Sequence, residues 1–113
     1  MELNIEHRAN LSIIKLPEAF TGEFSKFLKA QLIALHNGGT RNIVLDLSKT
    51  TSLGPTGLAV VLETTKLCKH SMGYCVLINV KEATLNLIKM SQQLSVVNIK
   101  DSLEEAVIFM FND

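Results

Sequence analysis

Hydrophobic residues alternate with polar ones, or run together, in five stretches of the chain, and each stretch predicts a β-strand. The stretches are residues 2–7, 11–16, 42–47, 74–80 and the brief run Val96, Val97 and Ile99. Residues 2–7 alternate as a half-buried strand does. Only a short turn separates them from residues 11–16, so these two strands are predicted to form an antiparallel hairpin. The nearly continuous apolar runs at 42–47 and 74–80 predict buried strands.

Four other stretches repeat their apolar side chains every three or four residues, which is typical of helices that pack through one face. They are residues 22–36, 55–71, 82–90 and 102–111. Thr21 is a candidate N-cap for the first helix, and Ser102 for the last. Pro55 suits the opening position of the second helix, where its missing N–H would have had no intrahelical partner. The side chains predicted to pack inward are Phe20, Phe24, Phe27, Leu28, Leu32 and Leu35, then Leu58, Val61, Leu62, Thr65 and Cys68, then Ala83, Leu87 and Met90.

The order of these elements, a hairpin followed by repeated helix–strand units, predicts the α/β class. A strand that is reached through a helix usually lies parallel to its predecessor. We therefore expect one mainly parallel sheet of four to five strands, with an N-terminal antiparallel hairpin and about four helices packed on it. With 113 residues and no internal repeat, the whole of 1–113 is expected to be a single domain.

Composition and charge narrow the classes of partner. Apolar residues make up 47% of the chain and charged residues 19%, which is typical of a globular protein. Eleven basic residues balance eleven acidic ones, so no global charge favours nucleic acid or an anionic membrane. No apolar run approaches the ~20 residues of a membrane span, and the first residues do not resemble a signal peptide. We expect a cytoplasmic protein that is a monomer or a weak dimer.

The residue types that usually carry chemistry do not converge in the sequence. His7, His36 and His70 fall on separate elements without ligand spacing, so no metal is expected. Cys68 and Cys75 could pair, but we interpret them as reduced core residues. None of the common phosphate-binding or nucleophile motifs is present. We expect no enzyme activity and no cofactor, and nucleotide binding remains a weaker hypothesis.

A hydroxyl-rich turn follows the buried strand at 42–47 and leads into the second helix. Asp46, at the end of the strand, is either a general base or, as we favour, a cap that accepts backbone N–H bonds from the turn. The turn contains Ser48, Thr50, Thr51 and Ser52. The helix then opens with Gly54, Pro55, Thr56 and Gly57. We expect these small residues to leave the free N–H groups of the first helical turn open to a partner.

Asp46-Leu47-Ser48, followed after five residues by Gly54-Pro55-Thr56-Gly57-Leu58, resembles the motif of the STAS family, the anti-sigma factor antagonists. The order and spacing of the other elements fit this family over nearly the whole chain. The resemblance implies a protein that binds a kinase-like anti-sigma factor and thereby frees a sigma factor. It also implies a partner-binding surface formed by Ser48, Ser52, Gly54, Pro55, Thr56, Gly57 and Leu58.

In the family, the anti-sigma kinase phosphorylates a serine at the start of this helix. That serine falls on Pro55, which has no hydroxyl, and the family's aspartate falls on Gly54. Thr56 is then the remaining, weaker candidate for a phosphoacceptor. A domain without the usual acceptor also suits constitutive docking. The alternative is therefore an accessory STAS subunit of a lipid-transport ATP-binding cassette complex, or of a stress-signalling assembly.

Overall fold

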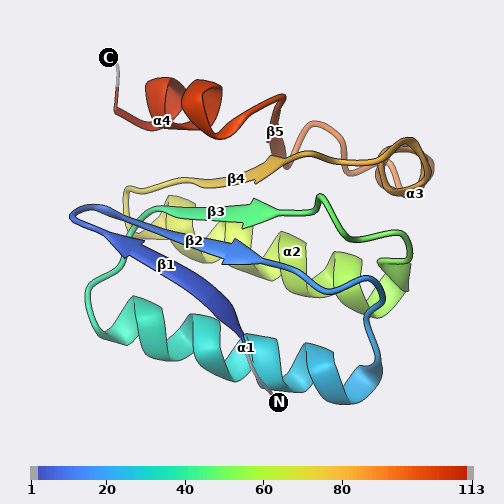
Figure 1. Cartoon of the computed structure of the whole chain (residues 1–113), viewed down its shortest axis with the longest axis horizontal. Coiled ribbons are helices and arrows are strands. Elements are labelled where there is room, and N and C mark those ends of the chain that lie inside the picture. Colours follow the sequence, from blue (N-terminus) through green and yellow to red (C-terminus); the bar gives the residue numbers. More distant parts are fainter. Residues whose placement is uncertain (1–2, 112–113) are drawn as a thin grey trace.

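The computed structural model describes residues 3–111 and contains one sheet whose strand order follows the order of the chain (Figure 1). The strands are β1 (Asn4–Arg8), β2 (Leu11–Lys15), β3 (Ile43–Asp46), β4 (Cys75–Ile78) and β5 (Asn98–Lys100). β1 and β2 are antiparallel, and the pairs β2–β3, β3–β4 and β4–β5 are parallel. The predicted hairpin and the predicted parallel order are both confirmed.

Four helices connect or follow the strands within these described residues. They are α1 (Gly22–Asn37), α2 (Gly54–His70), α3 (Glu82–Met90) and α4 (Leu103–Phe111). Figure 1 shows α1 and α2 together on one face of the sheet and α4 on the other. α3 sits beyond the end of the sheet to which β4 points. The predicted α/β class is therefore confirmed.

Alternate residues of the strands supply the cores of the two faces, because successive side chains of a strand point to opposite sides. Ile43 and Leu45 of β3 belong to the core under α1 and α2, whereas Val44 between them belongs to the smaller core under α4. All three side chains are at most 1% exposed. β3 is thus covered on both faces, which explains the continuous apolar run in its sequence.

The caps predicted for the first and last helices are confirmed. Thr21 Oγ1 accepts a hydrogen bond of 3.0 Å from the Phe24 backbone N–H and caps α1. Ser102 Oγ accepts one of 3.2 Å from the Glu105 backbone N–H, while the Glu105 carboxylate accepts one from the Asp101 N–H. These paired bonds satisfy N–H groups that would otherwise lack a partner at the start of α4.

Some predicted boundaries and packing faces are wrong. The last strand is residues 98–100, about two residues after the predicted run, although Val97 is buried in the core. Glu2 of the predicted first strand lies outside the described residues. Two of the three side chains predicted to pack from α3, Ala83 and Met90, are exposed, and Thr84 and Ile88 are buried instead. In α2 the predicted Leu62 is half-buried and does pack against the core, and Val60, which was not predicted to pack inward, is buried beside Val61.

Candidate functional site

The candidate site consists of Asp46, the loop Ser48–Leu53 and the start of α2 as far as Leu58. All of it lies at the end of the sheet to which the parallel strands point (Figure 1). Ser48, Ser52, Pro55 and Thr56 are exposed, and Gly54 is half-buried. Leu53, the N-cap residue of α2, forms no capping hydrogen bond through its side chain. The predicted surface is therefore open at these positions.

Two residues of the predicted surface are not open. Gly57 and Leu58 are both buried, and Leu58 is part of the core between α1, α2 and the sheet. A Cβ atom on Gly57 would lie 2.8 Å from Leu53 Cδ1 and 2.9 Å from Phe20 Cδ2. The expectation that Gly57 leaves space for a partner is thus wrong. Its small size serves the close packing of α2 against Leu53 and Phe20.

Gly54 has a different role from Gly57. Its φ is +69°, a backbone conformation that side chains with a Cβ rarely adopt, and nothing lies within 4 Å of the position its Cβ would take. The chain turns through this residue directly before Pro55, which occupies the opening of the helix. The Gly54-Pro55 pair therefore fixes the direction in which α2 leaves the loop and keeps Pro55 and Thr56 at the surface.

The side chain of Asp46 holds the loop through hydrogen bonds. Its Oδ1 atom accepts a hydrogen bond of 2.9 Å from the Ser48 backbone N–H and one of 3.0 Å from Asn79 Nδ2. Burial alone would raise the pKa of Asp46, but these hydrogen bonds and the nearby charge of Lys15 outweigh it and hold the pKa below its usual value. The carboxylate is thus ionised at neutral pH and already engaged. The interpretation of Asp46 as a structural cap is confirmed.

The segment after β2 holds the rest of the loop. Thr50, which is fully buried, donates a hydrogen bond of 2.8 Å from Oγ1 to the Pro17 carbonyl. The backbone N–H groups of Thr51 and Ser52 donate to the Glu18 carbonyl at 2.9 and 3.1 Å. The Ser52 carbonyl in turn accepts from Phe20 N–H at 3.1 Å. The hydroxyl-rich turn is therefore fixed by a second segment rather than only solvated.

Sequence reasoning missed Asn79 and the 17–20 segment, which support the site without forming its surface. Asn79 follows β4 with a φ of +56°, a conformation that asparagine tolerates better than most residues. It reaches Asp46 because β3 and β4 are parallel neighbours whose carboxyl ends meet at one edge. The available signal was that Asn79 directly follows a buried strand, and that Asp46 ends the strand before it in the sequence.

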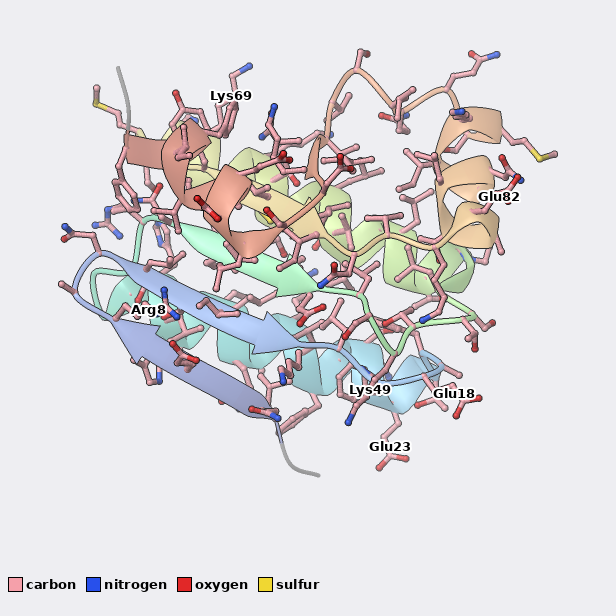
Figure 2. All side chains as sticks on the ribbon, turned by 45° about the horizontal axis from the view of Figure 1, so that its top comes forward. Arg8, Glu18, Glu23, Lys49, Lys69 and Glu82 are labelled. Carbon is pink, nitrogen blue, oxygen red and sulfur yellow. The ribbon has the colours of Figure 1, made fainter. Side chains whose placement is uncertain are left out.

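Charges of both signs surround the loop. Lys81 donates a hydrogen bond from its ammonium group to the Ser48 carbonyl, which ties the start of α3 to the loop. Figure 2 shows Lys49 and Glu18 close together at the loop end of the molecule, with Glu23 nearby and Glu82 on α3. The exposed surface of the site is therefore polar and of mixed charge, which is typical of the rim of a protein interface rather than of a nucleic-acid contact.

Outside the site, burial shifts the pKa of both cysteine thiols. Cys68 and Cys75 are both free and buried, as predicted. Burial raises the pKa of the Cys68 thiol to about 11 and raises that of Cys75 further, so neither is a thiolate at neutral pH. Within residues 3–111, no three histidine, cysteine or acidic side chains gather as a metal site would require. No helix in this range is both long and apolar enough to span a bilayer.

Comparisons with known proteins concern the family and the fold. The family model described as the STAS domain matches residues 2–106. No curated protein gives a significant match. Among solved structures, a Thermotoga maritima protein assigned as an anti-sigma factor antagonist is similar with 21% identity and a TM-score of 0.86, over 96% of this chain and 93% of that one.

Two further solved structures show the same arrangement. The Bacillus cell fate determinant SpoIIAA, in its phosphorylated form, has 15% identity and a TM-score of 0.76, over 96% of this chain and 97% of that one. A variant of RsbS from Moorella thermoacetica has 17% identity and a TM-score of 0.79, over 95% of this chain and 92% of that one. At these identities, the likeness concerns the fold.

Proposed function

The chain belongs to the STAS domain family, and from this premise we propose that it is a regulatory binding protein of the anti-sigma factor antagonist kind. In this proposal it docks on a kinase-like anti-sigma factor in the cytoplasm and catalyses no reaction. The contact surface is formed by Ser48, Ser52, Gly54, Pro55 and Thr56, while Gly57 and Leu58 shape it from below. The proposal is supported by the fold, which this chain shares with SpoIIAA, an anti-sigma factor antagonist.

The observation that carries the proposal is the rigid support of an exposed helix start. Pro55 and Thr56 are exposed, yet the loop before them is held by Asp46, by the buried Thr50 and by backbone hydrogen bonds to Glu18. A surface loop that only connects two elements would not need so many fixed contacts. A pre-organised surface loses less entropy when a partner binds, and so gains affinity from the same contacts.

The residues at the start of α2 also determine whether phosphorylation can regulate the site. SpoIIAA occurs in a phosphorylated and an unphosphorylated form. In our proposal, Pro55 occupies the position of the family's phosphorylated serine and removes that acceptor. Thr56 is exposed but lies one residue further on, which turns its side chain by about 100° around the helix. We therefore propose that docking is constitutive or is regulated by means other than phosphorylation of the helix start.

The missing hydroxyl at Pro55 also favours one alternative. An accessory STAS subunit of a lipid-transport ATP-binding cassette complex, or of a stress-signalling assembly, would stay bound to its partner and need no phosphate switch. The same surface would then contact a transporter ATPase or another assembly subunit. The identity of the captured partner separates these two functions directly.

The test compares partner binding by the wild-type protein and by Thr56→Arg. Thr56 is exposed, so the arginine should leave the fold and the melting temperature unchanged but obstruct a partner at the helix start. Met90→Arg is the control, because Met90 is 84% exposed and belongs to α3 rather than to the site. A partner is captured from native extract, identified, and titrated by calorimetry against all three proteins.

We expect a kinase-like anti-sigma factor to bind the wild type and Met90→Arg equally and to bind Thr56→Arg at least tenfold more weakly, as expected for obstruction at the centre of an interface. Capture of a transporter ATPase with the same dependence on Thr56 would support the alternative instead. Equal binding of the partner to all three proteins would place the interface elsewhere and overturn the proposal.

A further inference from the structure

The outer face of α4 exposes large apolar side chains. Glu104, Ile108 and Phe111 follow each other at steps of four and three residues and so lie along one side of the helix. Ile108 is 52% exposed and Phe111 is 46% exposed. The opposite side of the helix, with Ala106 and Met110, is already buried against the sheet. Packing of the fold therefore does not account for the apolar side chains on the outer face.

Phe109 borders this face and is fixed within the chain. Its ring packs edge-on against Tyr74 with 4.9 Å between the ring centroids. Lys100 Nζ lies 4.7 Å from the centroid of the same ring. These contacts hold α4 to β5 and to the residue directly before β4, and they make the outer face a rigid surface. Rigid apolar patches on the surface of a small protein mark sites of association.

Opposite charges lie at the two ends of the face. Asp101, Glu104 and Glu105 stand at the start of α4. At the other end, Phe111 lines a hollow of about 430 Å³ together with Arg8 and Arg41. Figure 2 shows Arg8 at this end of the molecule. Arg8 is paired with Glu6 at 2.6 Å, whereas neither Arg41 nor Glu104 forms an ion pair within residues 3–111. Arg41 Nη1 donates a hydrogen bond of 3.0 Å to the His36 carbonyl, and the charge of the guanidinium stays without an acidic partner in this range.

We propose that the outer face of α4 is the interface of a homodimer, in which two copies of α4 pack antiparallel about a two-fold axis beside Ile108. A two-fold interface brings the same surface of both copies together, so its charges must be self-complementary. The α4 face meets this condition. Because the axis lies midway between positions 104 and 111, Glu104 of one copy approaches Phe111 and Arg41 of the other.

Several properties of the chain favour a second copy as the occupant of this face. The net charge is zero, so no general repulsion opposes association of two copies. Antiparallel helices also place the negative end of each dipole near the positive end of the other. The helix has nine residues, or roughly 13 Å, so the interface is small and the dimer is weak. α2 lies on the other face of the sheet, so the candidate site stays accessible (Figure 1).

The test measures the monomer–dimer equilibrium of the full chain by analytical ultracentrifugation between ~10 µM and ~1 mM, where small interfaces dissociate. We expect the wild type to dimerise in this range. Ile108→Asp should weaken the dimer at least roughly tenfold, because it places a charge at the centre of the interface. Glu104→Arg and Arg41→Glu should each weaken it as well, since each brings two like charges together.

The double variant with Glu104→Arg and Arg41→Glu reverses the sign of each pair and should restore dimerisation. Met90→Asp, at an exposed apolar residue of α3, should dimerise like the wild type. Circular dichroism and the melting temperature of each variant show that the fold is retained. A wild type that stays monomeric at the highest concentration would overturn the proposal. The proposal would also be overturned if Ile108→Asp dimerised as strongly as the wild type, or if the double variant dimerised more weakly than both single variants.

Discussion

Helices α2 and α4 cover opposite faces of the same sheet, and they expose different kinds of surface. α2 has seven buried residues along its length and exposes Pro55 and Thr56 at its start, above a loop held by hydrogen bonds. α4 has two buried residues and exposes Ile108 and Phe111 along its side. The exposed start of α2 offers polar contacts on a supported loop, whereas the side of α4 offers apolar area that a partner can bury.

The largest effect should come from the buried side of α2. Leu58→Ala removes a side chain that is 6% exposed and should lower the free energy of unfolding by about 2–5 kcal/mol. Leu62→Ala should cost less, because Leu62 is half-buried. Ile108→Ala on α4 should change stability by less than about 0.5 kcal/mol. Urea unfolding of the three variants at a concentration where the protein is monomeric checks this order, and a cost at Ile108 as large as at Leu58 would contradict the comparison.

A smaller effect should separate two neighbouring residues at the start of α2. Gly57→Ala adds a Cβ atom that meets Leu53 and Phe20 at less than 3 Å, so it should destabilise the protein by ~1–2 kcal/mol despite the better helix propensity of alanine. Thr56→Ala, at an exposed position, should stay within about 0.5 kcal/mol of the wild type. Thermal unfolding measures both, and a more stable Gly57→Ala protein would show that α2 can move away from Leu53 and Phe20.

The support beneath the loop should depend on pH. The pKa of Asp46 is lower in the folded protein than its ordinary value of about 3.9, so its ionised form stabilises the fold above that value. This contribution is lost as the pH falls through the lowered pKa. Asp46→Asn keeps an acceptor but removes the charge, which should cost roughly 1 kcal/mol at pH 7. Melting temperatures of the two proteins should converge below about pH 4.

Asp101→Asn is the matched control for this pH series, because Asp101 is exposed and its carboxylate supports no buried loop. Its melting temperature should equal that of the wild type at every pH. A difference between Asp46→Asn and the wild type that persists unchanged into acid would show that the charge of Asp46 does not stabilise the loop.

The smallest effect on the fold should be that of phosphorylation at Thr56. A phosphate there adds about −1.5 to −2 charges at the start of a helix, which favours them by roughly 0.3–1 kcal/mol. The modification should therefore leave the melting temperature nearly unchanged. We expect it to form slowly, because a displacement of even ~1 Å in a kinase site can cost a hundredfold in rate. Intact mass after incubation with the cognate kinase decides this, and stoichiometric phosphate on Thr56 within minutes would contradict it.

The strand and helix pattern predicted most of the fold because β3 and β4 are buried on both faces and their apolar runs are long. β5 was misplaced because it has only three residues, and the neighbouring Val96 and Val97 are as apolar as the strand itself. The packing face of α3 was wrong because a helix of nine residues offers few repeats. Its apolar residue Met90 is exposed, whereas Ile88 enters the core.

The sequence predicted the turn after β3 and the start of α2, but not the contacts that hold them. The cap formed by Asp46 could be predicted, since Ser48 is only two residues away. The contacts from Asn79 and Glu18 join segments about 30 residues apart, and local patterns carry no information on them. Gly57 was misinterpreted because a glycine at a helix start fits either an open surface or a close contact. The positions of Leu53 and Phe20 decide between the two.

The strand order of the sheet also has a consequence for the way the chain folds. Each strand after β1 pairs with the strand just before it in the sequence, so each pairing closes only the segment of chain that joins two consecutive strands. The entropy lost in closing a loop grows with the length of that loop, and folding is faster when contacts are local. As the chain leaves the ribosome, each strand therefore meets an edge that is already formed. The sheet can grow in one direction during synthesis, and no early strand has to wait unpaired for a distant one.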